Sequence, residues 1–208
     1  MGTTQDEGTW NYYGVENINT TSEFLDMLLY DGLSESTAKK IAQVYPDDLA
    51  QGIPSTLTGR PGNETGLGYQ WKRVSAYNGD KIMQAARRLA SQSWAKHNVN
   101  VYTYVYDVIF HAKWWQYGAP TDQADQKKTF EPLSYLMTSM LISFINTQDP
   151  NNVPMNGTVS WPKYSIRDPR AFVFDVNATE LCRVEKDNFR SEAIENWIDM
   201  FSTNEYPR

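Results

Sequence analysis

The sequence predicts an α/β fold in which helices outnumber a few strands. Aromatic and β-branched residues alternate with their neighbours over residues 101–107, which is the period-two pattern of a mostly buried strand. A shorter alternating run at 171–176 predicts a second strand. Residues 131–146 and 187–201 instead place apolar side chains at helical spacing. Strands that alternate with amphipathic helices are typical of the α/β class.

Two short helices are expected within residues 21–45, separated by a break at Asp31-Gly32, after a polar first segment. The segment 2–14 is a predicted loop, and on spacing alone Asp6 and Glu7 are interpreted as a solvated acidic turn. Thr21 or Ser22 can cap the first helix, and Ser34 can cap the second. Pro46 ends the second helix, and residues 47–68 form a long loop.

A further helix is predicted over residues 69–96, with a break at Asn78-Gly79. Asp80 is a suitable N-cap for its second half. Arg87 and Arg88 form the main basic cluster and are interpreted as a solvated or ion-paired face. His97 follows the helix, where it can act as a cation at the carboxyl end or have no specific role.

The strand at 101–107 leads into a loop with two tryptophans, Trp114 and Trp115, and a Gly-Ala-Pro turn. Pro120 has no N–H group to donate, so the strand ladder cannot continue through this turn. In open α/β sheets, binding sites form outside the carboxyl ends of strands. This loop is therefore the first candidate for a functional segment.

Composition excludes several function classes. The net charge of −6 argues against a nucleic-acid partner, which requires clustered Lys and Arg. No apolar run approaches the roughly 20 residues needed to span a membrane. The two histidines and Cys182 lack metal-ligand spacing, and Gly66-x-Gly68 lacks the lysine and the preceding strand of a phosphate-binding loop. We therefore expect no cofactor and no metal, and the lone Cys182 allows no internal disulfide.

Four Asn-x-Ser/Thr sequons favour a secreted glycoprotein, although a chain rich in Asn and Thr can contain them by chance. They lie at Asn19, Asn63, Asn156 and Asn177. Secretion requires a signal peptide, and the residues after Met1 are too polar to form one. A fragment of a longer secreted precursor would reconcile the two observations.

Several short motifs, taken together and in order, resemble the type-B carboxylesterases, the group of cholinesterases and fungal lipases. The motifs are Asp6-Glu7-Gly8, the run VYTYVYD at 101–107 with its tryptophan-bearing loop, Gly118-Ala119-Pro120, Phe144 to Asn151, and Trp161-Pro162-Lys163-Tyr164. The resemblance extends from Gly2 to about Phe201. It implies that residues 1–208 are the carboxyl-terminal part of a single α/β-hydrolase domain, with the nucleophile in an absent amino-terminal part.

The resemblance also implies site residues. The family uses a Ser-His-Glu triad, and Glu7 matches the acid, which orients the histidine. Thr121 occupies the position of the histidine, and its hydroxyl cannot relay a proton near neutral pH. His111, ten residues earlier, is an alternative base. The sequence contains no Gly-x-Ser-x-Gly nucleophile motif.

Three hypotheses for the function follow. The chain is the carboxyl-terminal fragment of a serine ester hydrolase, inactive alone, whose partner is the missing amino-terminal half and whose full-length form acts on small-molecule esters. Alternatively, it is a catalytically dead family member that acts as a binding or adhesion module. The third hypothesis is a stand-alone, mainly helical binding module unrelated to the family.

Overall fold

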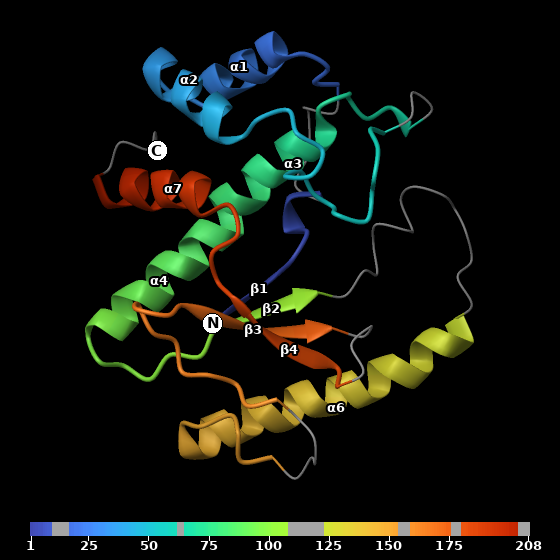
Figure 1. The fold of residues 1–208 in the computed structure, drawn as a ribbon, viewed down its shortest axis with the longest axis vertical. Coiled ribbons are helices and arrows are strands. Elements are labelled where there is room, and N and C mark those ends of the chain that lie inside the picture. The colour runs from blue at the N-terminus through green and yellow to red at the C-terminus, as the bar shows by residue number, and fades with distance from the viewer. Residues whose placement is uncertain (10–16, 62–64, 108–122, 154–158, 176–179, 204–208) are drawn as a thin grey trace. The chain divides into compact units, whose positions relative to one another are not determined.

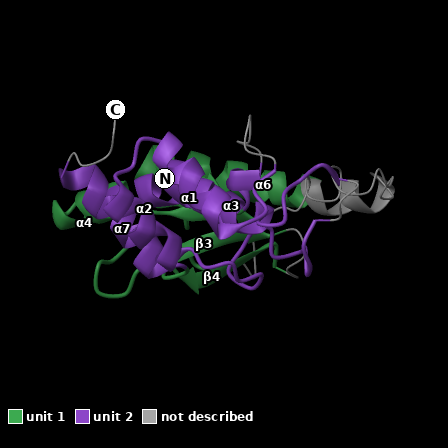
Figure 2. Ribbon diagram, turned by 90° about the horizontal axis from the view of Figure 1, so that it is seen from above, with its two compact units in different colours: residues 1–5, 90–189 green, residues 6–89, 190–208 purple. Residues whose placement is uncertain are grey.

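The computed structural model describes residues 1–9, 17–61, 65–107, 123–153, 159–175 and 180–203. The chain divides into two compact units, which Figure 2 colours separately. The first unit contains residues 1–5 and 90–189, and the second contains residues 6–89 and 190–208. The chain therefore leaves the first unit after Gln5 and returns to it at Ala90, within the helix Ala85–Lys96.

A mixed sheet forms the centre of the first unit. Among the described residues its strands are β1 (Gly2–Thr4), β2 (Tyr104–Asp107), β3 (Arg170–Asp175) and β4 (Cys182–Lys186), in the order β1-β2-β3-β4 (Figure 1). β2 is parallel to both β1 and β3, whereas β4 is antiparallel to β3. The three parallel strands therefore share one carboxyl edge.

Helix α6 (Gln123–Thr147) covers one face of this sheet (Figure 1). Its buried Leu133, Leu136 and Met140 join a core cluster with Trp161 and the β3 residues Phe172 and Phe174. The ring of Trp161 stacks on Phe172 with centroids 4.9 Å apart, and its Nε1 donates to the Thr103 carbonyl at 3.1 Å. Trp161 therefore fills the core and also satisfies a backbone acceptor.

The second unit is helical and has an aromatic core. It contains α1 (Thr21–Tyr30), α2 (Glu35–Val44), α3 (Trp71–Gly79) and α7 (Ser191–Thr203). The Tyr77 ring on α3 meets Phe24 and Tyr45 edge-on, each with centroids 5.8 Å apart, and Trp197 at 5.4 Å. Edge-to-face geometry of this kind is the favourable arrangement of aromatic pairs.

The long helix predicted at 69–96 contains a π-helical turn in place of a break. α3 continues through η3 (Asp80–Gln84) into α4 (Ala85–Lys96). The prediction of Asp80 as an N-cap is wrong, because its side chain is buried and bonded to Arg190. A solvated face at Arg87 and Arg88 is also wrong, since both are at most 1% exposed.

Other elements differ in part from expectation. Ser34 caps α2 as predicted, but Thr20 caps α1 in a complete capping box with Glu23. Strand β1 lies where a loop was predicted, and β4 was not anticipated. The strand predicted at 171–176 is confirmed as β3. In the described part of the chain, no helix combines the length and apolar character of a membrane span.

Candidate active site

The carboxyl edge of the parallel strands is where the two predicted catalytic segments leave the sheet. Thr4 ends β1 opposite Tyr106, and the Gln5 backbone N–H donates to the Tyr106 carbonyl at 3.0 Å. Glu7 follows two residues after Gln5. β2 ends at Asp107, and the chain then enters residues 108–122. Because β1 and β2 are parallel neighbours, both segments leave the same edge.

The predicted base positions lie outside the described residues. Thr121 and His111 both belong to residues 108–122. The assignment of Thr121 to the histidine position, and of His111 as an alternative base, therefore stays a prediction.

Glu7 begins a short 3-10 turn, η1 (Glu7–Thr9), that we call, together with Asp6, the acid turn. Thr9 closes it: its backbone N–H and its hydroxyl both donate to the Asp6 carbonyl, at 3.0 and 2.7 Å. The Asp6 Oδ1 atom is fully buried, although Asp6 and Glu7 are both half-buried as whole residues.

Gly8 brings the backbone of the acid turn into contact with α3. A Cβ atom at position 8 would lie 1.9 Å from the Ser75 carbonyl oxygen and 2.5 Å from the Gly79 nitrogen. Those are backbone atoms of a helix and cannot move aside locally. Only a glycine therefore fits beside Glu7 in this position.

A buried polar network lies beside this contact in the second unit. Arg190 donates to Asp80 through Nε and Nη2, both at 2.7 Å, and the Tyr45 hydroxyl donates to Asp80 Oδ2 at 3.0 Å. Trp197 Nε1 donates to the Tyr45 hydroxyl at 3.0 Å. Burial, with the charge of Asp80, raises the pKa of Tyr45 well above its usual value, so the phenol stays a neutral donor.

In the first unit, Arg183 on β4 joins the ends of β2 and β3. It donates to Asp107 Oδ2 through Nη2 at 2.8 Å, to Asp175 through Nη1, and to Glu185 through Nε at 2.5 Å. Partial burial lowers the pKa of Arg183, but its bonds to Asp107 and Glu185 outweigh this and raise the pKa overall. Arg183 thus fixes Asp107, the residue from which the predicted base loop departs.

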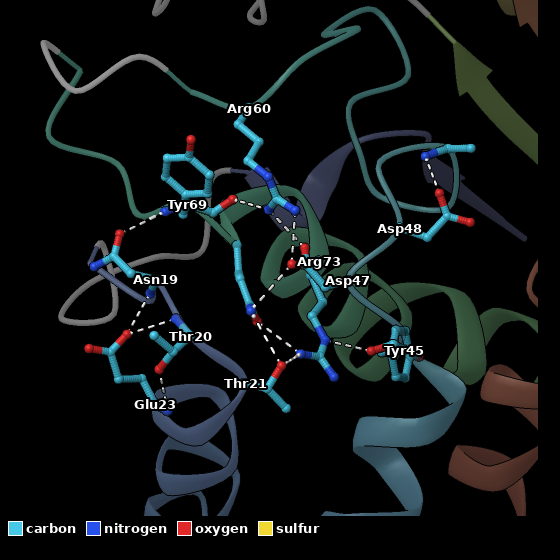
Figure 3. Close-up of polar contacts among 12 residues, drawn as sticks. Asn19, Thr20, Thr21, Glu23, Tyr45, Asp47, Asp48, Arg60, Tyr69 and Arg73 are labelled. Carbon is cyan, nitrogen blue, oxygen red and sulfur yellow. Dashed lines mark hydrogen bonds and ion pairs between the residues drawn. The ribbon is translucent and has the colours of Figure 1, made fainter.

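The Asn19 sequon lies at the amino end of α1, where all three of its residues make hydrogen bonds (Figure 3). Asn19 is exposed; its Oδ1 accepts from the Tyr69 backbone N–H at 3.0 Å, and its Nδ2 donates to the Asn17 carbonyl at 2.7 Å. The Thr21 hydroxyl accepts from Arg73 Nη1 at 3.3 Å. The other sequons, at Asn63, Asn156 and Asn177, lie outside the described residues.

Arg73 in the same view is a structural cation (Figure 3). It donates to the carbonyls of Tyr45 and Ala42, at 2.5 and 2.7 Å, and thereby satisfies the carboxyl end of α2. Its guanidinium carbon lies 4.0 Å from the centroid of the Phe24 ring. Burial lowers the pKa of Arg73 to about 10. These partners leave Arg73 no evident catalytic role.

Sequence patterns did not reveal the buried or partly buried charge pairs within each unit. Asp80 and Arg190 are separated by 110 positions, and Asp107 and Arg183 by 76. A local signal near Asp80 is Asn78-Gly79 inside a helical pattern, which predicts a break rather than a buried charge. Among the described residues, no group of three or more His, Cys, Asp or Glu could hold a metal ion.

Two fungal lipases are similar to this chain in sequence. It is 29% identical over 210 residues to Lipase 2 of Geotrichum candidum, and the match covers 94% of this chain and 33% of that lipase. It is 26% identical over 178 residues to Secreted lipase 1 of Botryotinia fuckeliana (strain B05.10), covering 79% of this chain and 29% of the relative. The chain thus spans about a third of the length of these lipases. No protein-family model matches it.

The fold is similar to that of a solved fungal protein. EstA of Aspergillus niger superposes with a TM-score of 0.71 at 16% identity, over 99% of this chain and 40% of EstA. The predicted α/β-hydrolase fold is therefore confirmed, with this chain corresponding to a helix-rich portion of it. The predicted resemblance to the carboxylesterase and lipase group is confirmed as well.

Proposed function

We propose that this chain is the carboxyl-terminal part of a type-B carboxylesterase or lipase-like serine ester hydrolase. The observation that carries the proposal is the match to Lipase 2 of Geotrichum candidum along 94% of the chain. Residues 1–208 would form a single domain together with an amino-terminal half, which supplies the nucleophile. The small-molecule ester is a substrate of that complete domain.

Glu7 is the proposed acid of the triad. A carboxylate in this role accepts a hydrogen bond from the imidazole, holds it in the correct tautomer and stabilises the imidazolium. The chain segments that follow β1 and β2, which contain Glu7 and the proposed base, leave one edge of the sheet. Thr121 at the base position cannot take the proton of a serine, so the chain as it stands has no competent base.

Secretion is part of the proposal. Support comes from the similarity to the secreted lipase of Botryotinia fuckeliana and from the exposed position of Asn19 within its sequon. We propose N-linked glycans at Asn19, Asn63, Asn156 and Asn177, attached to a longer precursor that carries the signal for export.

A second candidate function is a binding or adhesion module that has lost catalysis. The observation that favours it is Thr121, because a family member under selection for hydrolysis needs a titratable base at this position. The two candidates differ in whether a single substitution restores turnover.

The test joins this chain to the amino-terminal part of Lipase 2 from Geotrichum candidum and measures hydrolysis of p-nitrophenyl butyrate. With Thr121 the joined enzyme should bind ester but turn over slowly. Thr121→His should raise kcat by roughly 10²–10⁴-fold, the usual contribution of a positioned base. Adding Glu7→Gln should remove most of this gain, because the imidazole loses its orienting partner.

His111→Ala is the matched control in the joined enzyme, and it should change kcat little. If His111→Ala abolishes turnover while Thr121→His has no effect, His111 is the base and the assignment of Thr121 is wrong. If neither changes a measurable rate, the binding-module function is favoured.

A further inference from the structure

Arg183 on β4 reaches the carboxylates of three strands in the first unit. In the ladder it lies opposite Val173 of β3. Its Nη2 atom donates to Asp107 Oδ2 at 2.8 Å, its Nη1 atom donates to Asp175 Oδ2, and its Nε atom donates to Glu185 Oε1 at 2.5 Å. Each nitrogen of the guanidinium group therefore serves a different carboxylate. We call Arg183 and its three acceptors the strand-end cluster.

The strand register places two of these carboxylates face to face. Asp107 at the end of β2 pairs with Asp175 at the end of β3 in the parallel ladder. Like charges that lie directly opposite one another destabilise a strand pair. The two side chains are only 22% and 14% exposed, so water and salt screen their repulsion incompletely. The guanidinium group of Arg183 donates to both and supplies the counter-charge that this register needs.

The strand-end cluster connects strands that are not neighbours in the sheet. β3 lies between β2 and β4, so the hydrogen bond from Arg183 to Asp107 joins the strands on either side of it. On the other side of β2, the Gln5 backbone N–H donates to the Tyr106 carbonyl at 3.0 Å. The end of β2 is therefore held from both sides at the carboxyl edge, where the binding sites of open α/β sheets form. The segment that follows Asp107, residues 108–122, contains both proposed base positions.

We propose that Arg183 is a positioning residue: it holds the carboxyl ends of β2 and β3 in register and thereby fixes the point from which the segment with the proposed base leaves the sheet. The structure describes all four residues of the strand-end cluster, and their hydrogen bonds do not depend on the proposed function. The role of Arg183 toward the base rests on the proposed function. The experiment therefore has two readouts, one for each statement.

The first readout is hydrogen exchange of backbone amides in the full 208-residue chain. The Gln5 and Asp175 amides donate to carbonyls at the carboxyl edge, whereas the Phe172 amide donates near the amino ends of the same strands, each at 3.0 Å. Arg183→Gln should accelerate exchange of the Gln5 and Asp175 amides by roughly fivefold or more, because the two opposed carboxylates then repel each other without a cation. Exchange of the Phe172 amide should change by less than about twofold.

Three further variants test the cause of this change. Arg170 begins β3 and pairs with Asp168 at 2.8 Å, so Arg170→Gln is the matched control and should leave the exchange of both carboxyl-edge amides unchanged. Arg183→Lys should give intermediate rates, because an ammonium group keeps the charge but lacks the fork of donors. Asp175→Asn added to Arg183→Gln should slow exchange of the Gln5 amide again, because the repulsion between carboxylates is removed.

Equal exchange rates in Arg183→Gln and Arg170→Gln overturn the claim that Arg183 holds the strand ends. No recovery in the double variant overturns the like-charge explanation. If Arg183→Gln does not fold, the comparison of Arg183→Lys with Arg170→Gln decides whether Arg183 holds the strand ends.

The second readout separates positioning from general stability, and it uses the joined enzyme with Thr121→His. Arg183→Gln should lower kcat by roughly tenfold or more with KM unchanged, as expected for a displaced catalytic group in an intact ester site. Arg183→Lys should recover part of this loss, and Arg170→Gln should leave kcat unchanged. Unchanged kcat in Arg183→Gln overturns the positioning role. If Thr121→His produces no turnover, the proposed function fails and the role toward the base fails with it, while the exchange result still decides whether Arg183 holds the strand ends.

Discussion

Asp80 and Arg190 form an enclosed ion pair at the junction of α3 and α7. The Asp80 side chain is fully buried and that of Arg190 is 15% exposed. Asp80→Asn removes the negative charge of the side chain but keeps its shape. The positive charge of Arg190 then stays buried without its counter-charge. We expect a loss of about 3–5 kcal/mol in unfolding free energy, measured by urea denaturation.

A matched surface pair provides the control for Asp80→Asn. Lys39 and Glu35 lie 2.5 Å apart on α2, with side chains 63% and 75% exposed. Lys39→Met should have no measurable effect, because exposed pairs in water contribute little. If the Asp80→Asn and Lys39→Met variants have the same unfolding free energy, the buried pair does not stabilise the fold.

Cys182 illustrates how burial controls reactivity at a single residue. The thiol is 3% exposed and donates to the Glu180 carbonyl at 3.2 Å. Burial raises the pKa of the Cys182 thiol above its usual value of 9.0, and this outweighs the hydrogen bond from the Val159 backbone. A raised pKa leaves less thiolate at a given pH, and the thiolate is the reactive form.

We therefore predict that iodoacetamide labels Cys182 slowly at pH 8 in the native chain. The rate should still rise with pH above 9.0, where an ordinary thiol has reached half-ionisation. The same chain in guanidinium chloride is the reference. Equal labelling rates in the native and unfolded chain at pH 8 would show that the thiol is accessible.

At the scale of elements, the amino end of α1 depends on its capping box. The Thr20 hydroxyl accepts from the Glu23 backbone N–H at 3.2 Å, and Glu23 Oε2 accepts from the Thr20 backbone N–H at 2.9 Å. Thr20→Ala should cost about 1 kcal/mol, the usual value of an N-cap, whereas Thr20→Ser keeps the hydroxyl and most of the stability. The midpoints of urea denaturation are measured for both variants. A lower midpoint for Thr20→Ala than for Thr20→Ser indicates that the hydroxyl caps the helix.

The helices at 21–30 and 35–44 could be predicted because their signals are local. Ser34 followed by an apolar stripe indicates where α2 begins, and that prediction is confirmed. The buried face of a longer helix is harder to predict from the sequence. The apolar side chains at helical spacing in residues 131–146 include Ile145, yet Ile145 is 76% exposed. A helix with apolar residues on several sides does not by itself show which side packs against the sheet.

At the scale of the molecule, the 208-residue chain should be catalytically silent. The sequence has no Gly-x-Ser-x-Gly elbow and carries Thr121 at the position proposed for the base, and loss of triad members removes several orders of magnitude in rate. The assay is hydrolysis of p-nitrophenyl butyrate by the purified chain. Saturable turnover that a serine-directed phosphonate abolishes would contradict this prediction.

The amino-acid sequence by itself determined the resemblance to carboxylesterases and lipases, the α/β class, and the positions of helices with clear caps. It also singled out Glu7, because the Asp-Glu-Gly motif is a contiguous pattern. Motifs, caps and periodicity all lie within one stretch of chain, so they can be recognised without knowledge of distant partners.

Only the tertiary structure decided the pairing of Gly2–Thr4 with Tyr104–Tyr106. The pairing of Asp80 with Arg190, across 110 positions, is of the same kind. A three-residue strand gains its stability from the neighbour that accepts its hydrogen bonds. A buried charge is tolerated only where the fold brings its counter-charge. The local sequence around Gly2–Thr4 or Asp80 does not show which distant residues pair with it, so both pairings follow from the fold.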